Sequence, residues 1–344
     1  MTTVQARPAA RPSPAAVLRW HRPLIVLAAV MAVCAVVSVG GLLLDDRELL
    51  GQPIWAKPLK FSVSIAVYAL TWAWLVHQLT RFRRTAWWLG TVSAVMLGVE
   101  QIVIVAAVLR GTTSHFNVST GLNTTLWAAM GMAIGVVWVA TFVVSLMLFA
   151  SPGPDHARNL AVRFGALIAV FGMAVAFLMT IPSAAQIQDF DGVAGAHAVG
   201  VADGGTGLPF LGWSTTGGDL RIPHFIGMHA LQAIPLFLLV LELLARRVPA
   251  LRSVHVRARL VTVAAVGWTA VTALLTWQAL RGQSIVHPDG LTVLVAAVLL
   301  VGLVAGASWA LRARSTAVST AASDEGSDES GVTRHRPGTV HRAG

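Results

Sequence analysis

One acidic residue lies inside a long apolar run of this sequence. Glu100 falls within the run 86–109, next to Gln101. An ionised carboxylate at the centre of a membrane-spanning helix costs about 2.5–3.5 kcal/mol, so such a group faces a partner inside the bundle or is protonated. We predict that Glu100 is catalytic, as a proton carrier, metal ligand or counter-ion. The alternative is a structural hydrogen bond between helices, with Gln101 contributing.

Three histidines and an aspartate form a second group able to do chemistry. The stretch GDLRIPHFIGMH contains Asp219, His224 and His229, and His115 follows the run that holds Glu100. His224 and His229 are five positions apart, about 140° around a helix, so they do not chelate as an i,i+4 pair does. We predict a metal site from His115, His224 and His229 with Asp219, or alternatively Glu100, as the fourth ligand, and expect a divalent metal such as zinc. His229 is also a predicted catalytic residue, and the alternative for each histidine is a hydrogen bond within the bundle.

The only two lysines, Lys57 and Lys60, lie three positions apart at the start of an apolar run. This spacing puts both ammonium groups on one helix face, where they can bind a carboxylate, an anionic headgroup or Glu100. The alternative is that both extend to the membrane surface. Haem is the second expected cofactor, with propionates held by basic side chains. The remaining predicted ligand-binding residues are Arg110, Arg221, Gln232, Gln278 and Arg281.

Composition defines the elements that must position these residues. Of 344 residues, 56% are hydrophobic and 12% are charged, and the mean hydropathy is +0.71. Soluble domains carry about 25% charged residues, so the natural solvent of this chain is lipid. The net charge of +10 resides in short Arg clusters between apolar runs, which excludes a nucleic-acid-binding face. Cys34 is alone, so a disulfide framework is excluded.

Eight apolar runs are long enough to cross a bilayer, which requires roughly 20 residues in a helix. We therefore predict an all-α, polytopic transmembrane helical bundle with about eight spans. The segment 1–23 is basic and Pro-rich, 24–312 spans the membrane, and 313–344 is a polar tail expected to be disordered. The runs are 24–44, 59–79, 86–109, 125–149, 160–182, 223–245, 258–280 and 290–311.

The distribution of Arg predicts the orientation, with the N-terminus and the C-terminus both in the cytoplasm. Every connection on the inner side then carries positive charge, as cytoplasmic loops do. The Arg- and Ala-rich composition suggests a bacterial source and thus the plasma (inner) membrane. The inner positions are Arg7, Arg11, Arg19, Arg22, Arg81, Arg83, Arg84, Arg158, Arg163, Arg246, Arg247, Arg252, Arg257, Arg259, Arg312, Arg314, Arg334, Arg336 and Arg342. The outer positions are Arg47, Lys57, Lys60, Arg110, Arg221 and Arg281.

Polar residues gather on the outer side, and this asymmetry is the main functional signal. The outer segment 183–222 is long, Gly-rich and sparsely charged, so we expect it to fold over the bundle. On the inner side, Glu242 is explained by an i,i+4 ion pair with Arg246. The sequence therefore predicts an outward-facing polar pocket.

Two short patterns recur at similar offsets. Leu-Arg-Gly ends the third run at Arg110 and the seventh run at Arg281. The second run begins with Pro58 and Phe61, and the sixth begins with Pro223 and Phe225. These offsets fit a parallel 4+4 internal repeat. The alternative is coincidence, because Leu, Arg and Gly are common in this chain.

Three classes of function fit these features. The first is a metal- or haem-binding membrane enzyme that acts on a lipid-like or small anionic ligand. The second is a proton-coupled transporter or ligand-binding membrane protein, supported by Glu100 but weakened by the few polar residues on the inner side. The third is a structural or assembly subunit, in which polar residues only pack helices. The expected partners are the lipid bilayer and such a ligand.

Overall fold

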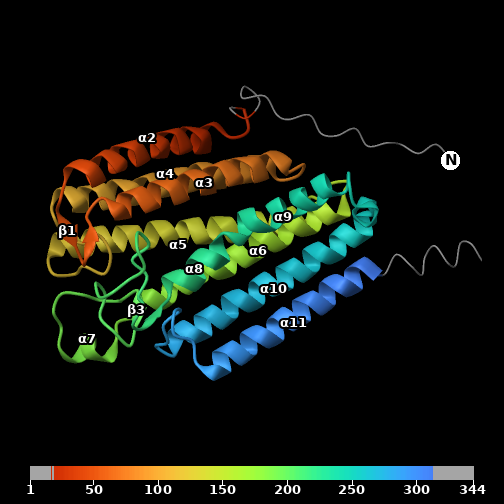
Figure 1. Cartoon of the computed structure of the whole chain (residues 1–344). Helices are drawn as coiled ribbons and strands as arrows, with labels where there is room; N and C mark the ends of the chain where they lie inside the picture. Colours follow the sequence, from red (N-terminus) through yellow and green to blue (C-terminus); the bar gives the residue numbers. More distant parts are fainter. Residues whose placement is uncertain (1–16, 18, 313–344) are drawn as a thin grey trace, which may run out of the picture.

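The computed structural model describes residue 17 and residues 19–312, and most of this chain is helical (Figure 1). The predicted tail 313–344 and most of the predicted segment 1–23 lie outside the described residues. Seven of the described helices are long and apolar enough to cross a membrane. They are α2 (Arg22–Leu44), α3 (Ala56–Gln78), α4 (Arg83–Leu109), α5 (Gly121–Phe149), α6 (His156–Met179), α10 (Val254–Leu280) and α11 (Gly290–Arg312).

An eighth candidate span is broken. Helices α8 (Arg221–Met228) and α9 (Ala230–Leu244) pass the same test only together, and they are bent by 46° at the break. The prediction of a helical bundle with about eight apolar spans is thereby confirmed at the level of helix number and composition. Each predicted run falls within or beside one of these helices.

Local sequence explains where several helices begin. The side chain of His21 accepts a hydrogen bond from the Leu24 N–H and so caps α2. Thr120 caps α5 and Asp155 caps α6 by accepting hydrogen bonds from backbone N–H groups in the first turn. These side chains satisfy donors that have no partner within the helix.

The helices pack in two groups that meet along α5 and α6 (Figure 1). In the first group α2 packs on α3, and α4 packs on both α3 and α5; in the second, α6 packs on α8, α9 and α10, and α10 packs on α11. The core of the first group contains Trp72, which is fully buried. Close approach of α6 and α8 depends on glycine, because a Cβ on Gly172 would lie only 2.2 Å from the carbonyl carbon of Gly227.

Short strands and one short helix lie at a single end of the bundle. Strands β1 (Glu48–Leu49) and β2 (Gln52–Pro53) form an antiparallel hairpin, with positive φ at Leu50 and Gly51 as a two-residue turn requires. Helix α7 (Ala184–Gln188) precedes β3 (Ala198–Val199), which pairs with β4 (Gly218–Asp219). The segment 180–220 is tied to this end by hydrogen bonds such as Ala196 N–H to the Met179 carbonyl. We call this the loop-covered end.

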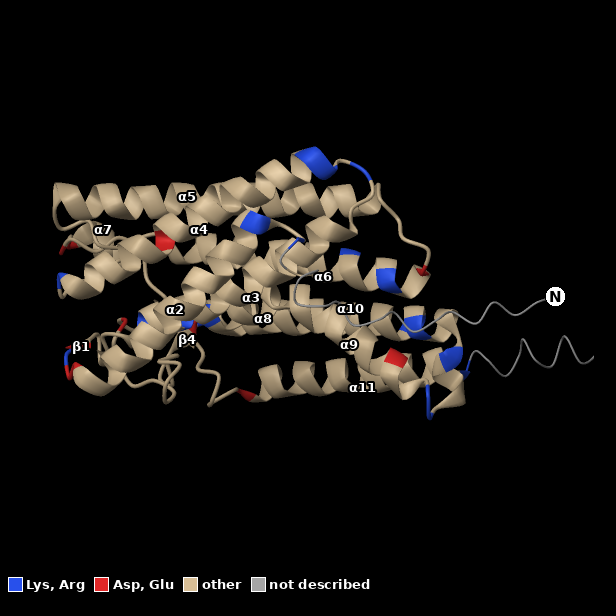
Figure 2. Ribbon diagram, turned by 90° about the horizontal axis from the view of Figure 1, so that it is seen from above, with Lys and Arg blue, Asp and Glu red and all other residues tan. Residues whose placement is uncertain are grey.

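The opposite end, where α2 begins and α11 ends, is the basic end. Figure 2 shows Lys and Arg concentrated there, whereas most Asp and Glu lie toward the loop-covered end. The prediction that Glu242 pairs with Arg246 was wrong. Its carboxylate accepts hydrogen bonds of 2.8 and 3.0 Å from Arg158 on α6, not from Arg246, because the tertiary packing of α6 against α9 brings Arg158 closer.

Candidate functional site

Glu100 and His115 lie together under the loop-covered end. Glu100 is on α4 and only 2% exposed, and one of its oxygens is 3.6 Å from Nε2 of His115. Its other oxygen, Oε2, has no hydrogen-bond partner among the described residues. Hydrogen bonds at functional sites often tighten only when a ligand is bound, so this spacing is compatible with proton exchange between the two groups.

Aromatic rings surround His115 in the connection between α4 and α5. Its ring centroid lies 5.4 Å from that of Trp127 and 5.5 Å from that of Phe61, and Nδ1 is 3.0 Å from the Ser114 hydroxyl. Burial lowers the pKa of His115 well below its ordinary value, and the nearby positive charges of Lys57 and His197 act in the same direction. The imidazole is therefore neutral near pH 7 and able to accept a proton only when its surroundings change.

Lys57 supplies the positive charge of this site. It lies in the first turn of α3 and is half-buried, and its charge acts on Glu100, His115 and His197. The charges of Glu100, Arg221 and Lys60 act on its ammonium group in turn. An ammonium beside a helix N-terminus favours anions, so this corner of the site is suited to a carboxylate or phosphate group.

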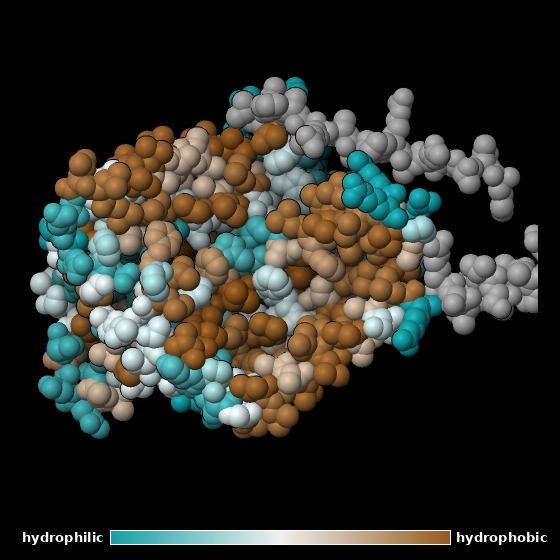
Figure 3. Space-filling model, viewed as in Figure 1, coloured by the Kyte–Doolittle hydropathy of each residue, from teal (hydrophilic) through white to brown (hydrophobic). Residues whose placement is uncertain are grey.

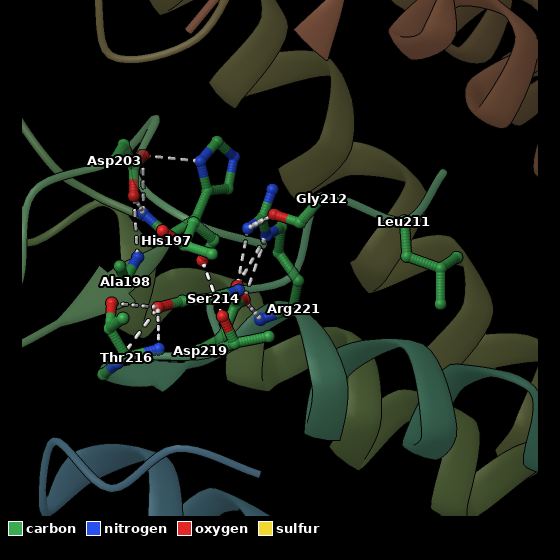
Figure 4. Close-up of polar contacts among 12 residues, drawn as sticks. His197, Ala198, Asp203, Leu211, Gly212, Ser214, Thr216, Asp219 and Arg221 are labelled. Atoms are coloured by element: carbon green, nitrogen blue, oxygen red, sulfur yellow. Dashed lines mark hydrogen bonds and ion pairs between the residues drawn. The ribbon is translucent and has the colours of Figure 1, made fainter. Parts of the chain in front are cut away.

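The covering loop contributes a second histidine–carboxylate pair, His197 and Asp203 (Figure 4). Nδ1 of His197 is 2.7 Å from Asp203, whose carboxylate also accepts the backbone N–H groups of His197 and Ala198. Burial opposes ionisation of Asp203, but these hydrogen bonds hold its pKa below the ordinary value. Burial lowers the pKa of His197. The His197 ring centroid is 6.4 Å from that of His115, which places this pair beside Glu100 and His115.

Two cations hold the covering loop in place. Lys60 on α3 donates to the carbonyls of Phe210 and Leu211, at 3.4 and 3.0 Å. Arg221, in the first turn of α8, donates to Asp219 from Nε and Nη2 of its guanidinium, and Nη2 also donates a 2.6 Å hydrogen bond to the Gly212 carbonyl (Figure 4). Lys60 and Arg221 are therefore engaged with the loop itself, unlike Lys57.

Asp219 also holds the covering loop in place. Its side chain is fully buried, and besides Arg221 it accepts a 2.8 Å hydrogen bond from the backbone N–H of Ser214 (Figure 4). All of its close partners are parts of the loop or of α8. The structure thus places this predicted metal ligand in an ion pair that shapes the loop.

Three other predicted ligand-binding residues lie at the loop-covered end but bond to neighbouring loop or helix-start residues. Arg110 donates a 2.8 Å hydrogen bond to Asn123, and Gln278 donates a 2.9 Å hydrogen bond to the Ser284 carbonyl. The Arg281 guanidinium lies 4.4 Å from the Trp277 ring centre. Each joins the end of one helix to the next segment of the chain. Arg281 also forms an ion pair with Asp289.

The two histidines of the broken span are placed separately. His224 Nδ1 is 2.9 Å from the Gly172 carbonyl on α6, whereas His229 lies at the break and contacts Gln232 at 3.2 Å. Within residues 19–312, no group of three or more His, Cys, Asp or Glu side chains is arranged to hold a metal ion. The four side chains of the predicted zinc site are therefore not assembled in this structure.

Sequence reasoning did not identify His197 and Asp203 as site residues. Both lie in the Gly-rich segment, where neither apolar periodicity nor a motif marks them. The available signal was indirect, since a long loop that packs on a bundle must satisfy its buried polar groups internally. A histidine and an aspartate six positions apart in such a loop are candidates for that role.

Comparisons with protein-family models, with curated proteins and with solved structures find no match to this chain.

Proposed function

We propose that this chain is a multi-pass membrane protein whose loop-covered end binds a small anionic molecule and exchanges a proton with it. The observation that carries the proposal is the pairing of buried Glu100 with His115, with Glu100 Oε2 left unpartnered. A buried carboxyl oxygen without a partner costs stability, and a bound ligand can satisfy it. Lys57 supplies the charge for the anionic group of that ligand.

The metal-dependent version of the enzyme hypothesis receives less support. A catalytic zinc site needs three protein ligands, and the described residues offer the pair Glu100 and His115 instead of such a group. An acid–base pair next to an ammonium group needs no metal to move a proton. The ligand class that fits is a carboxylate or phosphate, either free in solution or carried by a lipid.

Binding to purified protein in neutral-lipid nanodiscs tests this proposal, with acetate, inorganic phosphate and dodecanoate as probes. We expect at least one probe to bind, and Lys57→Met to weaken that binding about ten- to hundredfold, as for loss of a charge-assisted hydrogen bond. Arg47→Met is the matched control, because Arg47 lies at the same end but pairs with Asp45. Binding of dodecanoate alone would identify a lipid-like ligand.

Calorimetry in buffers of different ionisation enthalpy measures the proton exchanged on binding. The wild-type protein should take up or release a proton with the anion, and Glu100→Gln should bind the anion without this exchange. The proposal fails if none of the three anions binds, if Lys57→Met binds as tightly as the wild type, or if Glu100→Gln exchanges the same number of protons.

The orientation is part of the proposal: the basic end lies in the cytoplasm and the loop-covered end outside. In a Cys34→Ser background, Thr206→Cys should react with a membrane-impermeant maleimide in intact bacterial cells. Arg247→Cys, at the basic end, should react only after the cells are opened. The reverse pattern would overturn the orientation and leave the binding site unaffected.

A proton-coupled carrier is the second candidate, and the break between α8 and α9 favours it. Broken helices line the binding sites of many transporters. An uptake assay in proteoliposomes distinguishes a carrier from an enzyme or a receptor, because a carrier accumulates the bound anion in response to a proton gradient. A protein that binds the anion but does not accumulate it acts instead as an enzyme or a receptor.

A further inference from the structure

A separate group of polar residues lies at the break in the eighth span, away from Glu100 and His115. His229 is the last residue of the turn that ends α8 and the residue that precedes α9. Its Nδ1 is 3.2 Å from Gln232 Oε1, and the Gln232 amide donates at 3.1 Å to Thr71 on α3. The Thr71 hydroxyl in turn donates to the Val67 carbonyl at 2.8 Å.

The direction of these hydrogen bonds determines what His229 offers to a ligand. Because the Thr71 hydroxyl proton is given to Val67, Thr71 accepts from the Gln232 amide nitrogen. The Gln232 oxygen then faces His229, so Nδ1 carries the proton and donates. Nε2 of His229 is left with a lone pair, and this atom is buried without a hydrogen-bond partner among the described residues.

The surroundings connect this position to the bilayer. The Phe225 ring lies 4.3 Å from the His229 ring, centre to centre, and Phe225 is itself 41% exposed. Leu236, further along α9, is 57% exposed. Figure 3 shows a hydrophilic area in the middle of the apolar face, far from both ends, where Figure 1 places the break between α8 and α9. The Phe225 ring therefore packs against the His229 ring and is itself partly exposed.

We propose that the break between α8 and α9 is a second ligand site, which binds a hydroxyl-bearing molecule dissolved in the bilayer, such as a long-chain alcohol or a quinol. The hydroxyl donates to Nε2 of His229, and the apolar part of the molecule lies against Phe225 and the lipid-facing side of α9. Such a ligand satisfies the one acceptor in this polar group that the described chain leaves unpaired. Water is scarce at this depth, so a lipid-soluble donor is the appropriate partner.

Photo-crosslinking with a diazirine-bearing dodecanol tests this site in neutral-lipid nanodiscs. The methyl ether of the same probe is the matched control, because it keeps the apolar chain and lacks the donor. We expect the alcohol to label α8, α9 and the adjacent part of α3, with half-saturation at about five- to tenfold lower concentration than the ether. Equal labelling by the two probes, or labelling elsewhere, would overturn the proposal.

Two variants separate binding from folding. His229→Leu should abolish the preference for the alcohol, whereas His229→Gln, whose amide reaches about as far as Nε2, should retain part of it. Thr71→Val removes the acceptor that orients the Gln232 amide, so it should reduce the preference while His229 is unchanged. A His229→Leu protein that folds and still prefers the alcohol contradicts the proposal.

Lys57→Met and Glu100→Gln should label normally, because neither residue belongs to this site. Failure of anion binding at the loop-covered end would therefore leave the inference at His229 intact, and the reverse also holds.

Discussion

The two ends of the bundle use charged side chains in different ways. At the basic end, Arg163 donates to the carbonyls of Leu148 and Phe149, and Arg252 donates to the Ala245 carbonyl, so these cations complete helix ends. At the loop-covered end, carboxylates, histidines and lysines are brought together under a folded segment. The first arrangement satisfies backbone carbonyls beside water, and the second creates buried groups with unsatisfied bonding capacity.

This difference shows which charges in a membrane protein point to function. A cation that follows the positive-inside rule and bonds to helix-terminal carbonyls is explained by insertion and helix capping. A carboxylate such as Glu100, buried beside a neutral histidine, is not explained by either. The comparison predicts that substitutions at the two ends differ in both size and kind of effect.

The largest effect is expected for Asp219→Ala at the loop-covered end. Removing this fully buried carboxylate leaves Arg221 and the Ser214 N–H without their acceptor, and should lower the free energy of unfolding by about 3 kcal/mol. Equilibrium unfolding in mixed micelles measures it. Asp45→Ala is the control, since the Asp45–Arg47 pair is more exposed and should contribute much less to stability. Similar losses in both variants would show that the loop is not held by Asp219.

An intermediate effect is expected on lowering the pH. The folded-state pKa of His115 and that of His197 lie below the ordinary value, so at these two residues the unfolded state binds more protons, and their contribution to stability falls as the pH falls. Each histidine should contribute a loss of about 1 kcal/mol between about pH 6.5 and pH 5.5. The groups that face His115 are Glu100 on α4, Lys57 on α3, Trp127 on α5 and His197 in the loop.

The free energy of unfolding should change less with pH across this range in His115→Gln than in the wild type. His255→Gln is the control, because His255 is exposed at the basic end. An unchanged pH dependence in His115→Gln would mean that folding does not lower the pKa of this imidazole, which would contradict its burial beside Lys57.

The smallest effect is expected for Glu242→Gln near the basic end. The Arg158–Glu242 pair is well aligned, but the Arg158 side chain is 58% exposed, so the pair should contribute at most about 1 kcal/mol. A double-mutant cycle with Arg158→Gln isolates this contribution. A coupling energy near 3 kcal/mol would place a strong ion pair at the basic end and break the contrast between the two ends.

The two helix groups invite a second comparison that bears on the predicted 4+4 repeat. Each group begins with a helix, α2 or α6, followed by a connection that contains a two-stranded antiparallel ladder. In each group the last two helices pack on one another, α4 on α5 and α10 on α11. The repeat stays a prediction, since the shared order of elements does not establish a common origin.

Much of this architecture was determined by the sequence alone. Span number and position follow from hydropathy, because a helix that crosses lipid must be apolar along about 20 consecutive residues. The distribution of Arg along the chain predicts an orientation, because cytoplasmic loops and the adjacent helix ends carry an excess of positive charge. Glu100, Lys57 and His115 stood out as candidates because each is a polar side chain in or beside an apolar helix.

Only the tertiary structure decided which of these candidates meet. Glu100 and His115 converge because the chain turns back at the end of α4, and His197 and Asp203 join them because the 180–220 segment folds onto that end. Thr71 and Gln232 are 161 positions apart and meet through the packing of α3 against the broken span. Hydropathy describes each helix against its solvent, whereas convergence depends on the rotation of helices and the path of loops, which no local pattern specifies.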